Sequence, residues 1–280
     1  MISRAAREKT SVYINESTAE KVLEADSVHN RKLKSFTSVV MFVFLLLFGS
    51  SNTIANRTPQ ETYRILFVGN SLTAANNMPQ MIQALIDSTH SRRFEVHVVM
   101  QPGASLDDQW DSGEAARTIQ SGKWNIVILQ QGPSALPESR VVLVNATRKF
   151  ARVIRESGAT PALYMVWPAA IRLADFDAVR ESYVLAARSV EGIFFPAGEA
   201  WRAAWRKNSK LALYGPDGFH PTIEGSYLAA IVIASMITDR SAHSLPPTIQ
   251  FKDSIVKIDP SDAAVLQDAA DEAIRNFGHK

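Results

Sequence analysis

The sequence contains no cysteine. A chain without thiols has no disulfide framework, no cysteine nucleophile and no thiolate metal site. Its stability must therefore come from an ordinary hydrophobic core. With 280 residues, of which 46% are hydrophobic, the chain is long enough to bury such a core.

The sequence also lacks a surplus of positive charge outside its first residues. It holds 30 Lys and Arg against 28 Asp and Glu, and residues 1–34 account for the difference with seven against five. Residues 56–280 carry 23 of each sign, so the charge gives no argument for a nucleic-acid partner. The glycine patterns GxxxxGK and GxGxxG are absent as well, and we expect no nucleotide and no other cofactor.

Long hydrophobic runs are scarce, and the one near the N-terminus is short for a membrane span of about 20 residues. It covers residues 39–48, follows the basic stretch RKLK and precedes GSSNTIAN, which provides a small-x-small exit at Ala55. These are the parts of a secretory signal cleaved after Ala55. An uncleaved anchor stays open, because the uncharged window extends over residues 35–56.

Both interpretations place residues 56–280 outside the cytoplasm, as a periplasmic or secreted protein or as a membrane-anchored one. We therefore divide the chain into an N-terminal tail with its signal or anchor, residues 1–55, and one domain, residues 56–280. The N-terminal segment is the sole expected contact with a membrane.

Short apolar runs alternate with segments of helical period throughout residues 56–280. Such alternation is typical of an α/β fold in which a parallel sheet is covered by helices on both faces. Five strands are predicted, at 64–69, 94–100, 125–130, 161–167 and 192–197. The predicted helices cover 78–88, 111–121, 140–157, 175–190, 198–207 and 222–238, with Thr222 as an N-cap, and another follows Asp259-Pro260.

In sheets of this kind the loops that follow the strands carry function. The first strand runs into Gly69, Asn70 and Ser71, which would deliver one hydroxyl to the mouth of the sheet. Ser71 is the best candidate nucleophile. The alternative is that Asn70 and Ser71 only cap a turn or the next helix.

A serine becomes a nucleophile only beside a base, which in turn needs an orienting carboxylate. Asp217 and His220 lie three residues apart in the stretch DGFHP, with Gly218 between them. This spacing lets one loop aim both side chains at one point. Ser71, His220 and Asp217 are therefore the predicted catalytic residues.

These stretches resemble the SGNH (GDSL-type) hydrolases. The stretch GNSLT is similar to the family's Gly-Asp-Ser-Leu block, with Asn70 in place of Asp, and DGFHP matches its Asp-x-x-His pair. The stretch PGASL supplies Gly103 at the family's second block. The resemblance spans residues 64 to about 238. It implies a flavodoxin-like three-layer α/β/α fold with a five-stranded parallel sheet, and an oxyanion hole that includes the Ser71 and Gly103 N–H groups.

The third block departs from the family, because LQQGPSA has no asparagine. Glutamine carries the same amide on one more methylene, so Gln131 or Gln130 could supply the missing donor. We favour Gln131, which stands directly before Gly132, and Ser134 is the next candidate.

Other side chains have simpler interpretations. The acidic residues Asp107, Asp108, Asp111 and Glu114 could hold a cation, but a helix start at Asp111-Ser112 explains them by capping, and we expect no metal. Trp110 and Trp167 follow predicted strands, where core or lid packing is favoured over a platform for sugar rings.

The sequence therefore predicts an exported serine esterase that acts on a small-molecule or carbohydrate ester, with acetyl groups on carbohydrates as one substrate class. An acyl-lipid or thioester hydrolase is the alternative within this chemistry. In two rival hypotheses the protein is not an enzyme of this kind. One is a non-catalytic binding domain that kept the fold, and the other is a membrane-tethered scaffold.

Overall fold

The computed structural model describes residues 61–89, 92–251 and 254–278. All of them belong to one compact unit, Pro59–Lys280. The predicted tail and signal, residues 1–55, lie outside the described residues.

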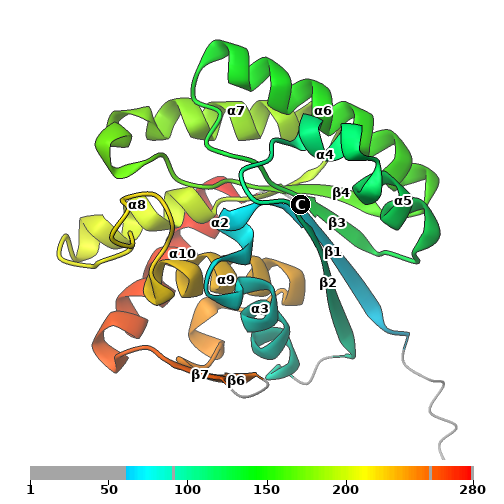
Figure 1. The fold of residues 1–280 in the computed structure, drawn as a ribbon. Coiled ribbons are helices and arrows are strands. Elements are labelled where there is room, and N and C mark those ends of the chain that lie inside the picture. Colours follow the sequence, from blue (N-terminus) through cyan, green and yellow to red (C-terminus); the bar gives the residue numbers. More distant parts are fainter. Residues whose placement is uncertain (1–60, 90–91, 252–253, 279–280) are drawn as a thin grey trace, which may run out of the picture. The chain divides into compact units, whose positions relative to one another are not determined.

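A five-stranded parallel sheet forms the centre of this unit (Figure 1). The strand order is β2-β1-β3-β4-β5, and every neighbouring pair is parallel. This order confirms the predicted flavodoxin-like α/β class, in which ligands bind where the strand order reverses, here between β1 and β3. The strands are β1 (Tyr63–Gly69), β2 (Phe94–Met100), β3 (Ile126–Leu129), β4 (Thr160–Tyr164) and β5 (Ile193–Phe195).

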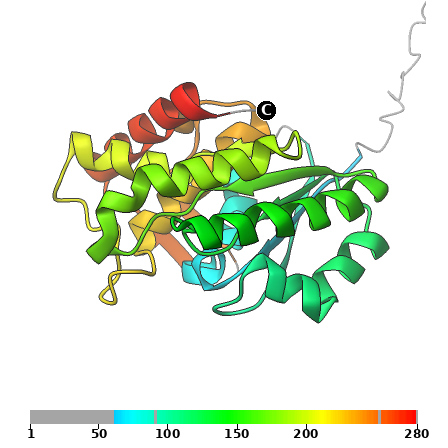
Figure 2. The same ribbon diagram turned by 90° about the horizontal axis from the view of Figure 1, so that it is seen from above.

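Helices cover both faces of the sheet and complete the three layers, as Figures 1 and 2 show. Because both faces are covered, the central strands are apolar on both sides, and residues 65–68 and 126–129 are at most 1% exposed. One layer contains α4 (Leu106–Ser112), α5 (Glu114–Ser121), α6 (Pro137–Glu156) and α7 (Phe176–Arg188). The other contains α3 (Met78–Asp87), α8 (Ala197–Lys207), α9 (Ile223–Thr238) and α10 (Pro260–Phe277).

Shorter elements connect the layers. The helix α2 (Ser71–Ala74) follows β1 and continues into the 3-10 turn η1 (Ala75–Asn77). The turn η2 (Ala170–Asp175) precedes α7, and η3 (Ala242–Ser244) follows α9. A hairpin of β6 (Thr248–Phe251) and β7 (Ser254–Lys257) packs against α3 and was not predicted.

The helix α9 is buried on nearly all sides, as its uniformly apolar sequence predicts. Thr222 is its N-cap, because the side chain accepts a hydrogen bond from the Gly225 N–H at 3.1 Å. Within the described residues, no helix combines the length and the apolar character that a membrane crossing requires.

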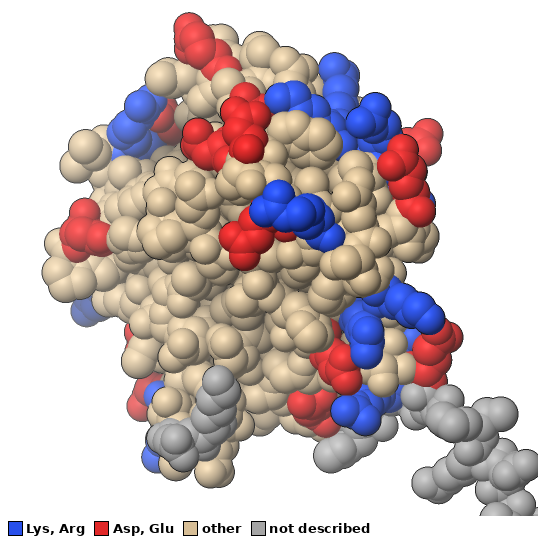
Figure 3. All heavy atoms as spheres, turned by 45° about the vertical axis from the view of Figure 1, so that its right-hand side comes forward, with Lys and Arg blue, Asp and Glu red and all other residues tan. Residues whose placement is uncertain are grey.

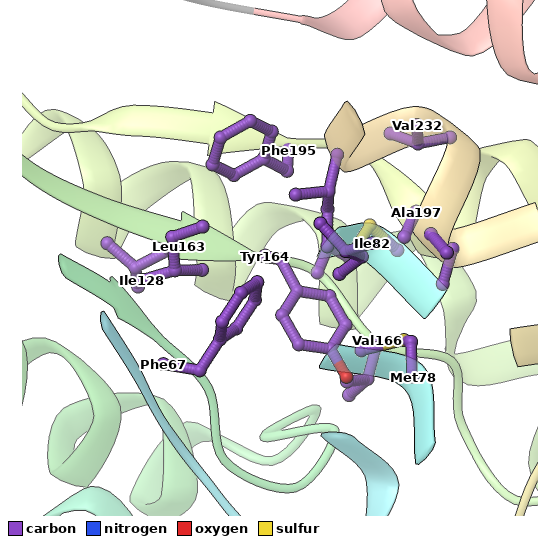
Figure 4. Packing of buried hydrophobic residues seen from close by; sticks show 14 of the residues in the cluster. Phe67, Met78, Ile82, Ile128, Leu163, Tyr164, Val166, Phe195, Ala197 and Val232 are labelled. Atoms are coloured by element: carbon purple, nitrogen blue, oxygen red, sulfur yellow. The ribbon is translucent and has the colours of Figure 1, made fainter. Parts of the chain in front are cut away.

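The core between the sheet and this helical layer is built from large side chains (Figure 4). Phe67 of β1 and Tyr164 of β4 lie beside Met78 and Ile82 of α3, and all four are fully buried. Tight packing of this kind fixes the carboxyl ends of the strands, from which the candidate site is built.

One predicted helix, residues 111–121, is wrong in its start and its continuity. Gly113 has a left-handed backbone with φ of 72° and divides the segment into α4 and α5. The helix start lies at Ser105, whose hydroxyl accepts from the Asp108 N–H while the Asp108 carboxylate accepts from the Ser105 N–H. Helix capping therefore explains Asp108, but the helix begins after Ser105 and not at the predicted Asp111.

Candidate active site

Ser71 lies where β1 turns into α2, directly after Asn70, and its side chain is partly exposed. Asn70 is the N-cap, because its side chain accepts from the Leu72 N–H at 3.1 Å. Gly69 leaves room for this turn: a Cβ there would lie 2.7 Å from the side-chain oxygens of both Gln130 and Thr73. The capping role thus belongs to Asn70, and the Ser71 hydroxyl is free for other contacts.

The loop before α9 brings Asp217 and His220 to this hydroxyl. His220 Nε2 lies 2.9 Å from Ser71 Oγ, and His220 Nδ1 lies 2.6 Å from Asp217 Oδ2. If Nδ1–H donates to the carboxylate, Nε2 has the free lone pair that can accept the serine proton. The three side chains therefore form one continuous chain of hydrogen bonds.

Asp217 is held by the backbone as well. Its Oδ1 atom accepts from the N–H groups of Phe219 and His220, at 3.0 and 2.9 Å. The hydrogen bond with the His220 ring, followed by these two backbone bonds, lowers the pKa of Asp217 to about 2. The carboxylate therefore stays charged at any ordinary working pH, although about half of its side chain is exposed.

Two further contacts hold the histidine loop in place, and neither role was predicted from the sequence. The amide nitrogen of Asn76, in η1, lies 2.9 Å from each of three acceptors, the carbonyl oxygens of Pro221 and Thr222 and Ser226 Oγ, which share its two hydrogens. Its φ of 53° is the left-handed conformation that asparagine tolerates better than most residues. Asn76 thus joins the segment after Ser71 to the segment after His220.

The second contact comes from the chain that leaves β4. Trp167 Nε1 donates to the Phe219 carbonyl at 3.0 Å, and the Ala170 N–H donates to the Gly218 carbonyl at 2.8 Å. Gly218, with φ of 66°, provides the turn between Asp217 and His220. The loop is thus fixed from a neighbouring strand end.

Gly103 lies in the exposed loop after β2, with φ of 70° and open space where a Cβ would project. Within the described part of the chain, neither its N–H nor that of Ser71 has a protein hydrogen-bond partner. Two backbone donors are thus available near the mouth of the sheet.

The side chains predicted as the third donor all have hydrogen-bond partners inside the protein. Gln130 is fully buried, and its amide donates to Asn70 Oδ1 at 3.0 Å and to the Gln131 carbonyl at 2.6 Å. We therefore correct the prediction for Gln130: both amide hydrogens are bonded inside the protein, and none is left for an oxyanion.

Gln131 and Ser134 are also engaged. The Gln131 amide donates to Ser134 Oγ at 2.8 Å, and its oxygen accepts from the Leu106 N–H at 2.9 Å. Ser134 Oγ donates in turn to the Gly132 carbonyl at 3.0 Å. The Ser134 hydroxyl hydrogen is therefore used inside the protein. Gln131 uses one of its two amide hydrogens, and its role as the oxyanion donor stays a prediction.

The remaining candidates serve packing or helix capping. Trp167 is fully buried and stacked on Trp201 at 3.6 Å between ring centroids, so it is not a platform for a sugar ring. Trp110 packs edge-on against Phe150 at 5.2 Å. Of the acidic residues, Asp107 pairs with Lys149 at 2.6 Å.

No family model matches the sequence, and no curated protein is significantly similar to it. Solved structures are similar. A DUF4886 family protein from Bacteroides uniformis is 19% identical with a TM-score of 0.63, covering 77% of this chain and 96% of that one. A protein from Slackia heliotrinireducens described as a candidate SGNH hydrolase is 26% identical with a TM-score of 0.54, over 63% of this chain and 100% of that one.

A lipase/acylhydrolase from Enterococcus faecalis is 14% identical with a TM-score of 0.52, and the match covers 66% of this chain and 98% of that one. The match thus spans nearly the whole length of that protein, although few residues are identical. Together with the strand order, these similarities show that the chain has the SGNH-type hydrolase fold.

Proposed function

We propose that this protein is an exported serine esterase that hydrolyses carboxylic esters through Ser71, His220 and Asp217. One observation carries the proposal: the unbroken hydrogen-bond chain from Ser71 Oγ through the His220 ring to Asp217, with distances of 2.9 and 2.6 Å. A nucleophile, a base and an orienting carboxylate in this order are the parts that acyl transfer requires.

In the first half of the reaction, Ser71 Oγ attacks the acyl carbon while His220 Nε2 takes the serine proton. The tetrahedral intermediate then expels the alcohol, which receives that proton from His220, and an acyl-enzyme remains. In the second half, water gives its proton to His220 and attacks the same carbon. The acid leaves, and the proton returns to Ser71.

Asp217 keeps its negative charge throughout, because its pKa is lowered to about 2. It orients the imidazole and stabilises the imidazolium that forms in each step. The oxyanion would be held by the Ser71 and Gly103 N–H groups, which lack other partners in the described residues.

The contacts of Trp167 weaken the case for acetylated carbohydrates, since that ring is buried. A different observation favours an ester with an apolar acyl group. Ile171 is 94% exposed and Leu173 is 50% exposed, on the turn η2 that is hydrogen-bonded to the catalytic loop at Gly218. An acyl-lipid ester is therefore the second candidate substrate, because covering these side chains is favourable.

The test is a hydrolysis screen of wild type and Ser71→Ala over acetyl-xylan, short and long p-nitrophenyl esters, lysolipids and acyl-CoA. We expect turnover by wild type on at least one class and a loss of about 10³-fold or more in the variant. Folded wild type that hydrolyses none of them, or a variant that keeps more than a few per cent of the activity, would favour the non-catalytic binding domain.

A further inference from the structure

Four buried primary amides lie behind the candidate site, at the carboxyl ends of the three neighbouring strands β1, β2 and β3. Asn70 follows β1, Gln130 and Gln131 follow β3, and Gln109 lies in α4 after the loop that leaves β2. Their side chains are between 0% and 6% exposed. We call these four side chains the amide network.

Asn70 contacts both the turn that follows β1 and the loop that follows β2. Its Oδ1 atom accepts from the Leu72 N–H at 3.1 Å, which holds the turn that carries Ser71. Its Nδ2 atom donates to the Ala104 carbonyl at 3.0 Å, which holds the loop that carries Gly103. One side chain therefore links the two segments whose backbone N–H groups would bind the oxyanion.

Gln130 fixes Asn70 in this position. Its Oε1 atom accepts from the Asn70 N–H at 3.0 Å and from Thr73 Oγ1 at 2.7 Å. Its Nε2 atom donates back to Asn70 Oδ1 and to the Gln131 carbonyl. All four hydrogen-bonding positions of this buried amide are used, which is the condition for a buried polar group to rigidify its surroundings.

The other two amides connect α4, which follows the loop after β2, to the ends of β1 and β3. Gln109 Nε2 donates to the Gly69 carbonyl at 2.6 Å, at the end of β1. Gln131 Oε1 accepts from the Leu106 N–H at 2.9 Å, at the start of α4. The loop after β2 is therefore held from both sides as well as by Asn70.

Backbone groups fix the orientation of every amide in the network. An N–H can only donate and a carbonyl can only accept, so Asn70 must turn its oxygen to Leu72 and its nitrogen to Ala104. An aspartate at this position would keep the first contact and lose the second. Its carboxylate would face the Ala104 carbonyl in a site that is 6% exposed.

From these contacts we propose that Asn70 is the positioning residue of the oxyanion hole, and that the amide network sets the separation of the Ser71 and Gly103 N–H groups. The inference rests on the proposed ester hydrolysis. Donors that are fixed before the reaction stabilise the developing charge without reorganisation, so their placement affects the transition state more than the bound substrate.

The test is Asn70→Asp, which is nearly isosteric and removes the donor to Ala104. We expect kcat to fall about 10- to 100-fold, since displacement of a catalytic group by about 1 Å costs this much. KM should change less than about twofold. The affinity for a boronic acid, whose adduct with Ser71 mimics the tetrahedral intermediate, should fall in parallel with kcat/KM.

A role in stability alone predicts a different result, namely a lower melting temperature with kcat per folded molecule and boronate affinity unchanged. Asn70→Ser is the second variant, because serine is a favourable N-cap whose hydroxyl is too short to reach Ala104. It should show the same loss of kcat. Wild-type kcat and boronate affinity in whichever of the two variants folds would overturn the proposal.

Gln83→Glu is the matched control. Gln83 is a structural amide that joins α3 to β2, donating to the Phe94 carbonyl at 3.1 Å and accepting from the Val96 N–H at 2.7 Å. The same change from amide to carboxylate should here affect stability and leave kcat unchanged. If wild type itself hydrolyses no ester, the proposed function has failed. If wild type is active and Asn70→Asp equals it, only the role of Asn70 has failed.

Discussion

Asp217 uses its two oxygen atoms for separate tasks, and this allows them to be tested separately. Oδ1 holds the backbone of the loop, while Oδ2 contacts the His220 ring. Asp217→Asn can keep the first oxygen and replace the second by an amide nitrogen. The amide would donate to Nδ1 and so place the imidazole proton on Nε2, where it blocks proton transfer from Ser71.

We therefore expect Asp217→Asn to fold as wild type does and to lose about 10³- to 10⁴-fold in kcat. The measurement is steady-state hydrolysis on the best ester of the screen, with circular dichroism as the folding control. A decrease of less than about tenfold in a folded variant would show that His220 does not depend on this carboxylate.

The same carboxylate links stability to pH. Its pKa is lowered to about 2 in the folded chain, below the ordinary value of 3.8. The stabilisation is therefore complete above about pH 4 and is lost as the pH falls towards 2. The melting temperature of wild type should decrease more steeply than that of Asp217→Asn between pH 4 and 2, and parallel curves would contradict the shift.

Residue patterns predicted the candidate nucleophile and base but not the partners of the glutamines. The Asp-x-x-His spacing is local, so the sequence could indicate that both side chains reach one point. The contacts of Gln130 join residues 57 to 60 positions apart and depend on which face of the strand end each amide occupies. The sequence could therefore identify both glutamines as candidates, but it could not predict their hydrogen-bond partners.

At the scale of elements, the segment from β4 to η2 supports the loop that carries His220. Trp167→Phe would keep an aromatic ring against Trp201 and remove the hydrogen bond to the Phe219 carbonyl. The Phe219 carbonyl is only partly buried, so the loss of its donor costs about 1 kcal/mol, the low end of the range for a buried acceptor. We expect the variant to be less stable by this amount and to have a lower kcat, because the histidine loop is held less firmly.

Urea unfolding and steady-state kinetics measure the two effects. Trp110→Phe is the matched control, since Trp110 packs on Phe150 away from that loop and should leave kcat unchanged. If Trp167→Phe lost stability and kept its full kcat, the hydrogen bond from Trp167 to Phe219 would contribute to stability and not to catalysis.

The strands were predictable because continuous apolar runs are the signature of a buried parallel sheet. The break at Gly113 was not, since a single glycine inside a helical pattern often continues the helix. The β6–β7 hairpin was missed for a different reason. Its two strands have four residues each and are partly exposed, which gives them a weak pattern.

At the scale of the whole molecule, one hydrophobic core contains residues of every described strand and α-helix. Figure 3 shows Lys and Arg interspersed with Asp and Glu on the face it displays. The predicted domain, residues 56–280, should therefore fold without the segment that precedes it and unfold in one cooperative transition.

Calorimetry of residues 56–280, with the full chain as reference, tests this expectation by showing how many unfolding transitions occur. The kcat of the two proteins should agree within about twofold, because the candidate site draws all its residues from this part. Two separate transitions would contradict a single cooperative unit, and a large loss of kcat would show that the domain needs residues before position 56.

The most direct test of the central claim is covalent labelling with a fluorophosphonate, which reacts with an activated serine and not with an ordinary one. The labelled full-length protein is digested, and mass spectrometry locates the adduct. We expect one adduct, on Ser71, that is absent in Ser71→Ala and strongly slowed in His220→Ala. Absence of any adduct in the folded wild type, or an adduct that persists in Ser71→Ala, would contradict the assignment of Ser71 as the nucleophile.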